Sequence, residues 1–387
     1  MRVIGLMSGT SYDAIDAAAA DLDRDGDTLV LTPRGVLSRP YPPHVRQSIE
    51  ATLPPATTSM EQVCRLDTLI GQEFAALAAQ ADAELCDGAA DLVVSHGQTV
   101  YHWVEDGQVL GTLQLGQPAW IAERTGLPVV ADLRARDVAA GGQGAPLVSA
   151  FDVLWLGSRP GTPVALNLGG IANITVLASG SPPVAFDTGP ANALIDAGVR
   201  HATGGRADYD VDGALAARGR VDEDLLARLL TEPYYARPAP KSTGKELFSL
   251  PYLLTALAGA APAAADLAAT LTELTARTVA DAVLACGGTE VVAAGGGTRN
   301  PTLMARLAAA LGGVPLGTTA DLGVPTAAKE AYAFAVLGYL SVHGLTGTVP
   351  SCTGARHASV LGSLTPGRAP LTLPAPSPAP VRLRVAR

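Results

Sequence analysis

The 387-residue sequence is poor in aromatic residues, cysteines and charges, and each shortage excludes a class of protein. Only 4% of the residues are aromatic and 16% are charged, and 36 acids against 27 Lys and Arg leave a net charge of -9. A nucleic-acid partner requires a basic face that neutralises phosphates, so we expect none. The four cysteines are far apart in the chain and lack zinc spacing, which favours reduced thiols. They are Cys64, Cys86, Cys286 and Cys352.

The sequence also lacks an apolar run of about 18 residues, the length that a membrane-spanning helix needs. The apolar start of the chain reaches Ser8 and Asp13 too early for a signal peptide. We therefore predict a soluble, cytoplasmic protein without membrane segments. A content of 48% hydrophobic residues with 42 glycines indicates a folded, glycine-rich α/β chain. At about 150 residues per domain, two or three domains are expected.

One order of elements occurs twice along the chain. In the first half the patterns predict three consecutive strands, two helices with Ser59 as an N-cap, and a buried parallel strand. These segments are 2–7, 14–22, 28–41, 43–53, 59–85 and 90–102. In the second half, a strand, a glycine turn and a second strand are predicted over 162–180, and a third strand leads into a helix over 182–204. A further helix follows over 266–288, and a strand, a glycine turn and a helix follow over 289–311. Such duplication predicts two lobes with a ligand between them. The Pro-rich tail from Thr365 is expected to be an extended strap or a disordered end.

Three turns rich in small residues could hold a nucleotide. The turns "MSGTSYD" (7–13) and "NLGGIANIT" (167–175) leave backbone N–H groups free to bind anions, which suggests a nucleoside triphosphate. "AAGGGTRNP" (293–301) opens a helix at a strand end, where an adenosine could lie. The alternatives are ordinary turns, with Asp13 and Asp16 in solvent. Neither a P-loop nor a strand-linked G-x-G-x-x-G is present.

Asp187 in "FDTGPAN" follows an apolar strand, where partial burial could raise its pKa toward that of a general base. The alternative is that Asp187 caps the next helix. In "ADLRARDVAAGGQGAPL" (131–147), arginines beside acids could hold a carboxylate or phosphate, or form a surface ion-pair ladder.

Three further segments carry polar groups whose role the sequence leaves open. His96 could bind substrate or be a structural histidine. The polar loop with Lys241, Ser242, Thr243 and Lys245 could close on substrate or be plain surface. Glu330 could bind water of a magnesium ion or complement the start of a helix.

Together these motifs resemble the anhydro-N-acetylmuramic acid kinases, of the superfamily that contains acetate and sugar kinases, heat-shock ATPases and actin. The resemblance rests on eight ordered matches. They are "GLMSGTSYDAID", "SHGQT", "DLRARDVAAGGQGAPLV", "NLGGIANIT", "FDTGPAN", "PKSTGKELF", "GGGTRNP" and "PSCTGARHASVLG".

The resemblance implies an α/β protein of two ribonuclease-H-like lobes with ATP between them. The first expected lobe consists of residues 1–133 together with about 346–370. The second consists of residues 134–345 and carries ATP and the catalytic Asp, and a tail follows at 371–387. The implied reaction opens the anhydro sugar with water and phosphorylates its 6-oxygen, giving N-acetylmuramate 6-phosphate in peptidoglycan recycling. ATP and Mg²⁺ are the implied cofactors, the sugar and ATP are the small-molecule partners, and a homodimer is suggested.

The resemblance also implies roles for individual residues, with Asp187 as the base that activates water. The ATP-binding set is Gly9, Thr10, Ser11, Asp13, Asp16, Gly169, Gly170, Asn173, Gly295, Gly296, Gly297 and Asn300. The substrate-binding set is His96, Gln98, Asp132 and Arg134, and Glu330 is placed near the metal, through water.

The chain departs from the family pattern at Ala14 and Ala191, where the family usually has glycine. If either position requires a positive φ, alanine costs about 1 kcal/mol or more. Two other functions stay open. One is a related kinase acting on a simple hydroxyl or carboxylate, which needs no hydrolytic water. The other is an actin-like, nucleotide-dependent regulator, which predicts slow ATP hydrolysis without sugar stimulation.

Overall fold

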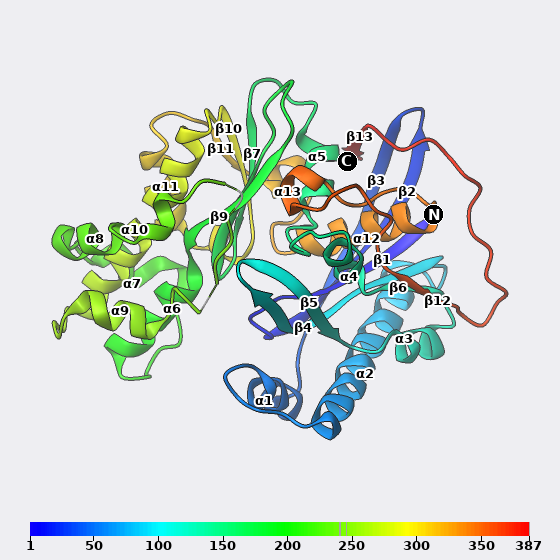
Figure 1. Cartoon of the computed structure of the whole chain (residues 1–387), viewed down its shortest axis with the longest axis horizontal. Coiled ribbons are helices and arrows are strands. Elements are labelled where there is room, and N and C mark those ends of the chain that lie inside the picture. The colour runs from blue at the N-terminus through cyan, green and yellow to red at the C-terminus, as the bar shows by residue number, and fades with distance from the viewer. Residues whose placement is uncertain (240, 245, 387) are drawn as a thin grey trace. The chain divides into compact units, whose positions relative to one another are not determined.

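The computed structural model describes residues 1–239, 241–244 and 246–386. The chain divides into two compact units, Met1–Ser158 with Ala328–Arg387, and Arg159–Ala327 (Figure 1). Within the described ranges, no helix is long and apolar enough to cross a membrane.

The first unit contains an eight-stranded sheet in the order β12-β6-β4-β1-β2-β3-β13, with β5 paired to β4. The strands are β1 (Arg2–Ser8), β2 (Ala14–Asp25), β3 (Thr28–Pro40), β4 (Leu92–Glu105), β5 (Gln108–Leu115), β6 (Val129–Ala131), β12 (Ser363–Thr365) and β13 (Arg382–Val385). The helices are α1 (Pro43–Thr52), α2 (Met60–Leu85), α3 (Pro118–Thr125), α4 (Leu133–Ala139), α5 (Ser149–Leu156), α12 (Lys329–Val342) and α13 (Pro350–Thr353). Ser59 caps α2 in a capping box with Gln62, as its position predicted.

Helices cover both faces of this sheet because side chains alternate along each strand. Ile4 and Leu6 of β1 share a buried cluster with Phe74 of α2. Gly5 faces α12 instead, and a Cβ on Gly5 would overlap the carbonyl oxygen of Ala331. Helix α12 therefore lies directly on the sheet, where it packs on β1, β2 and β4.

The second unit contains a five-stranded sheet in the order β11-β10-β7-β8-β9. The strands are β7 (Pro163–Leu168), β8 (Ile171–Val176), β9 (Val184–Pro190), β10 (Glu290–Ala294) and β11 (Leu316–Thr318). The α-helices are α6 (Asn192–Thr203), α7 (Ala214–Arg218), α8 (Glu223–Leu230), α9 (Leu250–Leu257), α10 (Ala264–Ala285) and α11 (Pro301–Ala310). Short 3₁₀ turns are η1 (Val211–Gly213), η2 (Pro233–Ala236), η3 (Gly296–Arg299) and η4 (Thr319–Leu322). Helices α10 and α11 share a buried cluster with the sheet.

The two sheets repeat one strand order and one set of directions. In the first unit β1 pairs antiparallel with β2 and parallel with β4, and β2 pairs antiparallel with β3. In the second unit β7, β8, β9 and β10 are related in the same way. This repetition confirms the predicted α/β duplication with a ribonuclease-H-like sheet in each half.

The boundaries of the compact units differ from those expected for the lobes. Residues 134–158 and 328–345 belong to the first unit rather than the second, because α12 packs on β1, β2 and β4, and α5 packs on α12. The Pro-rich tail is an extended strap that ends as β13, parallel to β3 (Figure 1).

Candidate functional site

A row of three polar residues crosses neighbouring strands of the second unit. Asn173 on β8 lies opposite Asn167 of β7 on one side and opposite Asp187 of β9 on the other. Residues that pair directly across strands share one face of the sheet. The three side chains therefore emerge on one face, with the Asn173 amide next to Asp187 and Asn167 one strand further away.

Asp187 is held by a segment that runs along the outer edge of β9. Its backbone N–H donates to the carbonyl oxygen of Lys241 at 3.1 Å, and its Oδ2 accepts the backbone N–H of Thr243 at 2.9 Å. Its own carbonyl oxygen accepts the Tyr234 hydroxyl at 2.8 Å. Burial raises the pKa of Asp187 to about 6, the Thr243 N–H bond opposes this rise, and the Glu246 charge adds to it. Asp187 does not cap the next helix, since the N-cap of α6 is Ala191.

The Gly169–Gly170 turn between β7 and β8 is fixed by the start of α6. The backbone N–H groups of Ala191 and Ala193 donate to the carbonyl oxygen of Gly170, and that of Asn192 donates to Gly169. These bonds satisfy amides that a helix start otherwise leaves unpaired. Ala191 has a φ of -131°, so alanine at this position carries no positive-φ strain.

The glycine corner after β10 lies against the end of β7. A Cβ on Gly295 would come within 2.7 Å of Asn167 Oδ1, and a Cβ on Gly297 within 2.7 Å of Leu168 Cβ. Gly296 has open space beside it and is exposed. Asn300 accepts the backbone N–H of Leu303 at 2.9 Å as the N-cap of α11. Close packing thus explains two of the glycines, and helix capping explains the Asn300 oxygen.

In the first unit, the turn between β1 and β2 is anchored by Gln98 of β4. The Gln98 side chain is completely buried; its Nε2 donates to the carbonyl oxygen of Gly9 at 3.1 Å, and its Oε1 accepts the Ser8 hydroxyl at 2.7 Å. Thr10, Ser11 and Asp13 are exposed at the tip, where Ser11 donates to Asp13 at 2.6 Å.

The left-handed residue of this turn is Tyr12, with a φ of 42°. Ala14 is not among the positive-φ residues and begins β2. Neither alanine that departs from the family pattern therefore replaces a glycine required by φ.

His96, Arg134 and Glu330 come together from β4, α4 and α12 of the first unit. Arg134 Nε donates to His96 Nε2 at 2.8 Å, and Arg134 Nη1 donates to the carbonyl oxygen of Gly144. An arginine only donates, so His96 is neutral, with its proton on Nδ1 donated to the Gly97 carbonyl oxygen at 2.8 Å. Burial and the Arg134 charge hold the pKa of His96 well below its usual value.

Glu330 is partly exposed in the first turn of α12, one turn before Phe334, whose ring contacts that of His96. Burial raises the pKa of Glu330, and the nearby Arg134 and Lys329 charges oppose that rise, while Asp16 adds to it. Asp16, His96, Arg134 and Glu330 thus form one electrostatic group.

The segment after β6 is organised around Asp137 rather than as a surface ladder of ion pairs. Asp137 is completely buried and accepts the Gly144 N–H at 2.8 Å and the Thr353 hydroxyl at 2.7 Å. Asp132 is exposed, with a φ of 53°, and partial burial of its carboxyl raises its pKa. Asp137 therefore holds the glycine loop, while Arg134 bonds His96 and Asp132 is exposed at the start of α4.

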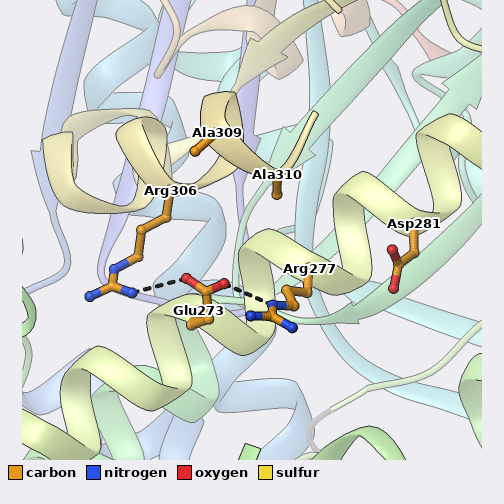
Figure 2. A pocket seen from close by; sticks show the side chains of 6 residues that line it. All are labelled: Glu273, Arg277, Asp281, Arg306, Ala309 and Ala310. Carbon is orange, nitrogen blue, oxygen red and sulfur yellow. Dashed lines mark hydrogen bonds and ion pairs between the residues drawn. The ribbon is translucent and has the colours of Figure 1, made fainter. Parts of the chain in front are cut away.

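A separate hollow of about 390 Å³ lies between α10 and α11 (Figure 2). Glu273 bridges Arg277 and Arg306 there, at 2.8 and 2.9 Å. The two arginines are thus neutralised by Glu273 and the nearby Asp281, so the hollow offers no free positive charge for an anion. None of the residues singled out by the sequence lines it.

Comparisons with known proteins agree over nearly the whole chain. A model of the family described as anhydro-N-acetylmuramic acid kinase matches residues 1–367. The chain belongs to the anhydro-N-acetylmuramic acid kinase family. The kinase of this name from Streptomyces avermitilis is 68% identical over 99% of both chains. That of Streptomyces coelicolor is 65% identical over 99% of this chain and 98% of the relative. Among solved structures, xylulose kinase from Rhodospirillum rubrum is 16% identical, with a TM-score of 0.43, over 87% of this chain and 89% of that one.

In this member of the anhydro-N-acetylmuramic acid kinase family, sequence reasoning missed the groups around Asp187. The row with Asn167 could have been found from strand register, since both asparagines stand in "NLGGIANIT". The Thr243 N–H bond had no local signal, because 56 residues separate Thr243 from Asp187.

Proposed function

We propose that this chain is the kinase that converts anhydro-N-acetylmuramic acid, a sugar released from peptidoglycan, into N-acetylmuramate 6-phosphate. ATP supplies the phosphoryl group to the 6-oxygen while water adds at the anomeric carbon and opens the anhydro bridge. The observation that carries the proposal is the family match over residues 1–367 together with relatives at 65 and 68% identity.

We assign Asp187 as the base that removes a proton from the attacking water. Its carboxylate stands on a rigid strand, and its pKa of about 6 leaves it ionised yet basic near neutral pH. The sugar alkoxide is a poor leaving group unless the γ-phosphoryl group captures its developing charge. Removal of one proton at Asp187 balances the addition of water.

The ATP-binding residues are proposed from the two hairpin turns and the glycine corner. Gly9 has room for a phosphate beside its backbone, because only Ser11 Oγ lies near a Cβ built there, at 3.8 Å, and the adjoining Thr10 and Ser11 are exposed. Gly169 is similarly open, with its nearest neighbour 3.4 Å from such a Cβ. Exposed Gly296 presents open backbone at the corner assigned to the adenosine.

On the sugar side we assign Arg134, Asp132 and His96. Arg134 keeps donor capacity beyond its bonds to His96 and Gly144, since only its Nε and Nη1 are engaged there. The substrate carries a carboxylate on its lactyl group, which an arginine binds well. Fully buried Gln98 is assigned to positioning the hairpin rather than to touching sugar.

Magnesium is proposed to be held chiefly by the nucleotide phosphates and water. The described part of the chain has no group of three or more His, Cys, Asp or Glu able to hold a metal. This fits Mg²⁺, which in kinases uses one or two carboxylates together with phosphate oxygens. Glu330 is the carboxylate assigned to its water shell, and the ion would neutralise phosphate charge.

The experiment that tests the function is ATP turnover with and without anhydro-N-acetylmuramic acid, with phosphorus NMR of the product. We expect sugar-dependent turnover, a 6-phosphate, and ¹⁸O from labelled water at the anomeric carbon. A product without solvent oxygen would favour a simple kinase, and ATP hydrolysis insensitive to sugar would favour a regulator.

A further inference from the structure

The segment of residues 241–244 lies along β9 and touches Asp187 only through backbone groups. Asp187 N–H donates to the Lys241 carbonyl, and Thr243 N–H donates to Asp187 Oδ2. Residues 241 and 243 thus bond the backbone and the carboxylate of the same residue, Asp187. What keeps the segment in place therefore determines the environment of the carboxylate.

The Lys241 side chain folds back from this segment onto η2. Its Nζ donates to the carbonyl oxygens of Tyr234 and Tyr235 at 3.2 and 2.8 Å and lies 4.8 Å from the centre of the Tyr234 ring. An ammonium group is attracted to an aromatic face and strengthens hydrogen bonds to carbonyls. The Tyr234 hydroxyl in turn donates to the Asp187 carbonyl oxygen at 2.8 Å.

We propose that Lys241 is a positioning residue for the catalytic base: it fastens the 241–244 segment to η2 so that the Thr243 N–H stays on the Asp187 carboxylate. This inference rests on the proposed function of Asp187 as base. The lysine acts through the hydrogen bonds that hold the segment, because its Nζ bonds the Tyr234 and Tyr235 carbonyl oxygens and not Asp187. A second cation near the Tyr234 ring is Arg237, which follows η2, is exposed and lies 5.8 Å from the centre of that ring.

The test compares Lys241→Met with the matched control Arg237→Met, which removes a cation over the same ring without any bond to the segment. For Lys241→Met we expect kcat at pH 7 to fall about tenfold to a hundredfold, as for other displaced catalytic groups. We also expect the acidic limb of the pH–rate profile to move to higher pH, because losing the Thr243 N–H bond raises the pKa of Asp187. The KM for ATP should stay unchanged, and Lys241→Arg should recover part of the rate.

A Lys241→Met variant with the kcat and acidic limb of the unmodified chain would overturn the inference. If that variant unfolds, the test is amide hydrogen exchange on the unmodified chain. The Thr243 amide should exchange as slowly as the Asp187 amide, and exchange at the rate of an exposed loop would overturn the inference. Failure of the unmodified chain to form a sugar 6-phosphate would sink the proposed function, and the exchange measurement would still report on the segment.

Discussion

Burial and one hydrogen bond act in opposite directions on the pKa of Asp187. Its strand position restricts its motion, burial raises its pKa, and the Thr243 N–H limits the rise. Both asparagines of the cross-strand row are uncharged, so they add no charge next to the Asp187 carboxylate.

Replacing Asp187 by asparagine keeps the shape of the side chain and removes its basicity. We expect Asp187→Asn to lower turnover by about 100-fold or more, since general-base catalysis contributes 10²–10⁴-fold. ATP binding, measured by titration calorimetry, should change little. Exposed Asp208→Asn is the control, and normal turnover of Asp187→Asn would refute the assigned base.

The pKa of Asp187 predicts the pH dependence of the reaction. Below about pH 6 the carboxyl is protonated and cannot accept a proton, so kcat/KM should fall tenfold per pH unit there and level off above. The measurement is the rate of sugar phosphorylation over pH 4.5–8. If the acidic limb of the pH–rate profile persists unchanged in Asp187→Asn, the limb arises from the titration of another group.

At the scale of elements, the hairpin between β1 and β2 owes its shape to a neighbouring strand. Gln98 of β4 bonds the Gly9 carbonyl and the Ser8 hydroxyl, so the turn is tied at its base while Thr10 and Ser11 stay exposed. The proposed phosphate contacts therefore fall on the exposed tip, while Gln98 holds the base of the turn.

Replacing Gln98 by leucine removes these bonds and the bond that Gln98 Oε1 accepts from the buried Tyr41 hydroxyl at 3.4 Å, while Ser8 and Gly9 keep bonds to Ala14 and Tyr12. We expect Gln98→Leu to lower the free energy of unfolding by about 1–3 kcal/mol and to raise the KM for ATP. Urea unfolding and initial rates measure the two effects. The control Gln108→Leu, at an exposed position of β5, should change neither the free energy of unfolding nor the KM for ATP. An unchanged KM for ATP in Gln98→Leu would show that the hairpin does not bind ATP.

At the scale of the whole molecule, the chain leaves the first unit after Ser158 and returns at Ala328. The helices next to these points, α5 and α12, are joined inside the first unit by an ion pair. Lys329 Nζ lies 2.6 Å from Asp152 Oδ1, and both side chains are 4% exposed. The stability of so deeply buried a pair requires both partners, because either one alone is a buried charge with neither solvent nor a counter-ion.

Replacing Lys329 by methionine therefore leaves Asp152 as a buried, unpaired charge. We expect the first unit to lose about 3–5 kcal/mol of unfolding free energy. Tryptophan fluorescence isolates this unit, since all three tryptophans, Trp103, Trp120 and Trp155, belong to it. Arg65→Met breaks an exposed pair with Glu61 and should cost about 1 kcal/mol or less; an equal loss in both variants would contradict the expectation.

The sequence by itself determined the repeated strand order, the long helices and the Ser59 cap, because these follow from local periodicity and turn chemistry. It placed Asp187 after an apolar strand, whereas β9 continues through Asp187 to Pro190, because pairing with β8 extends the strand. Tertiary structure alone decided that Gln98 is an anchor, that α12 and the tail join the first unit, and that Thr243 bonds Asp187. Each of these depends on contacts between residues far apart in the chain. Such contacts follow from how helices and strands pack against one another in the folded protein and not from any short sequence pattern.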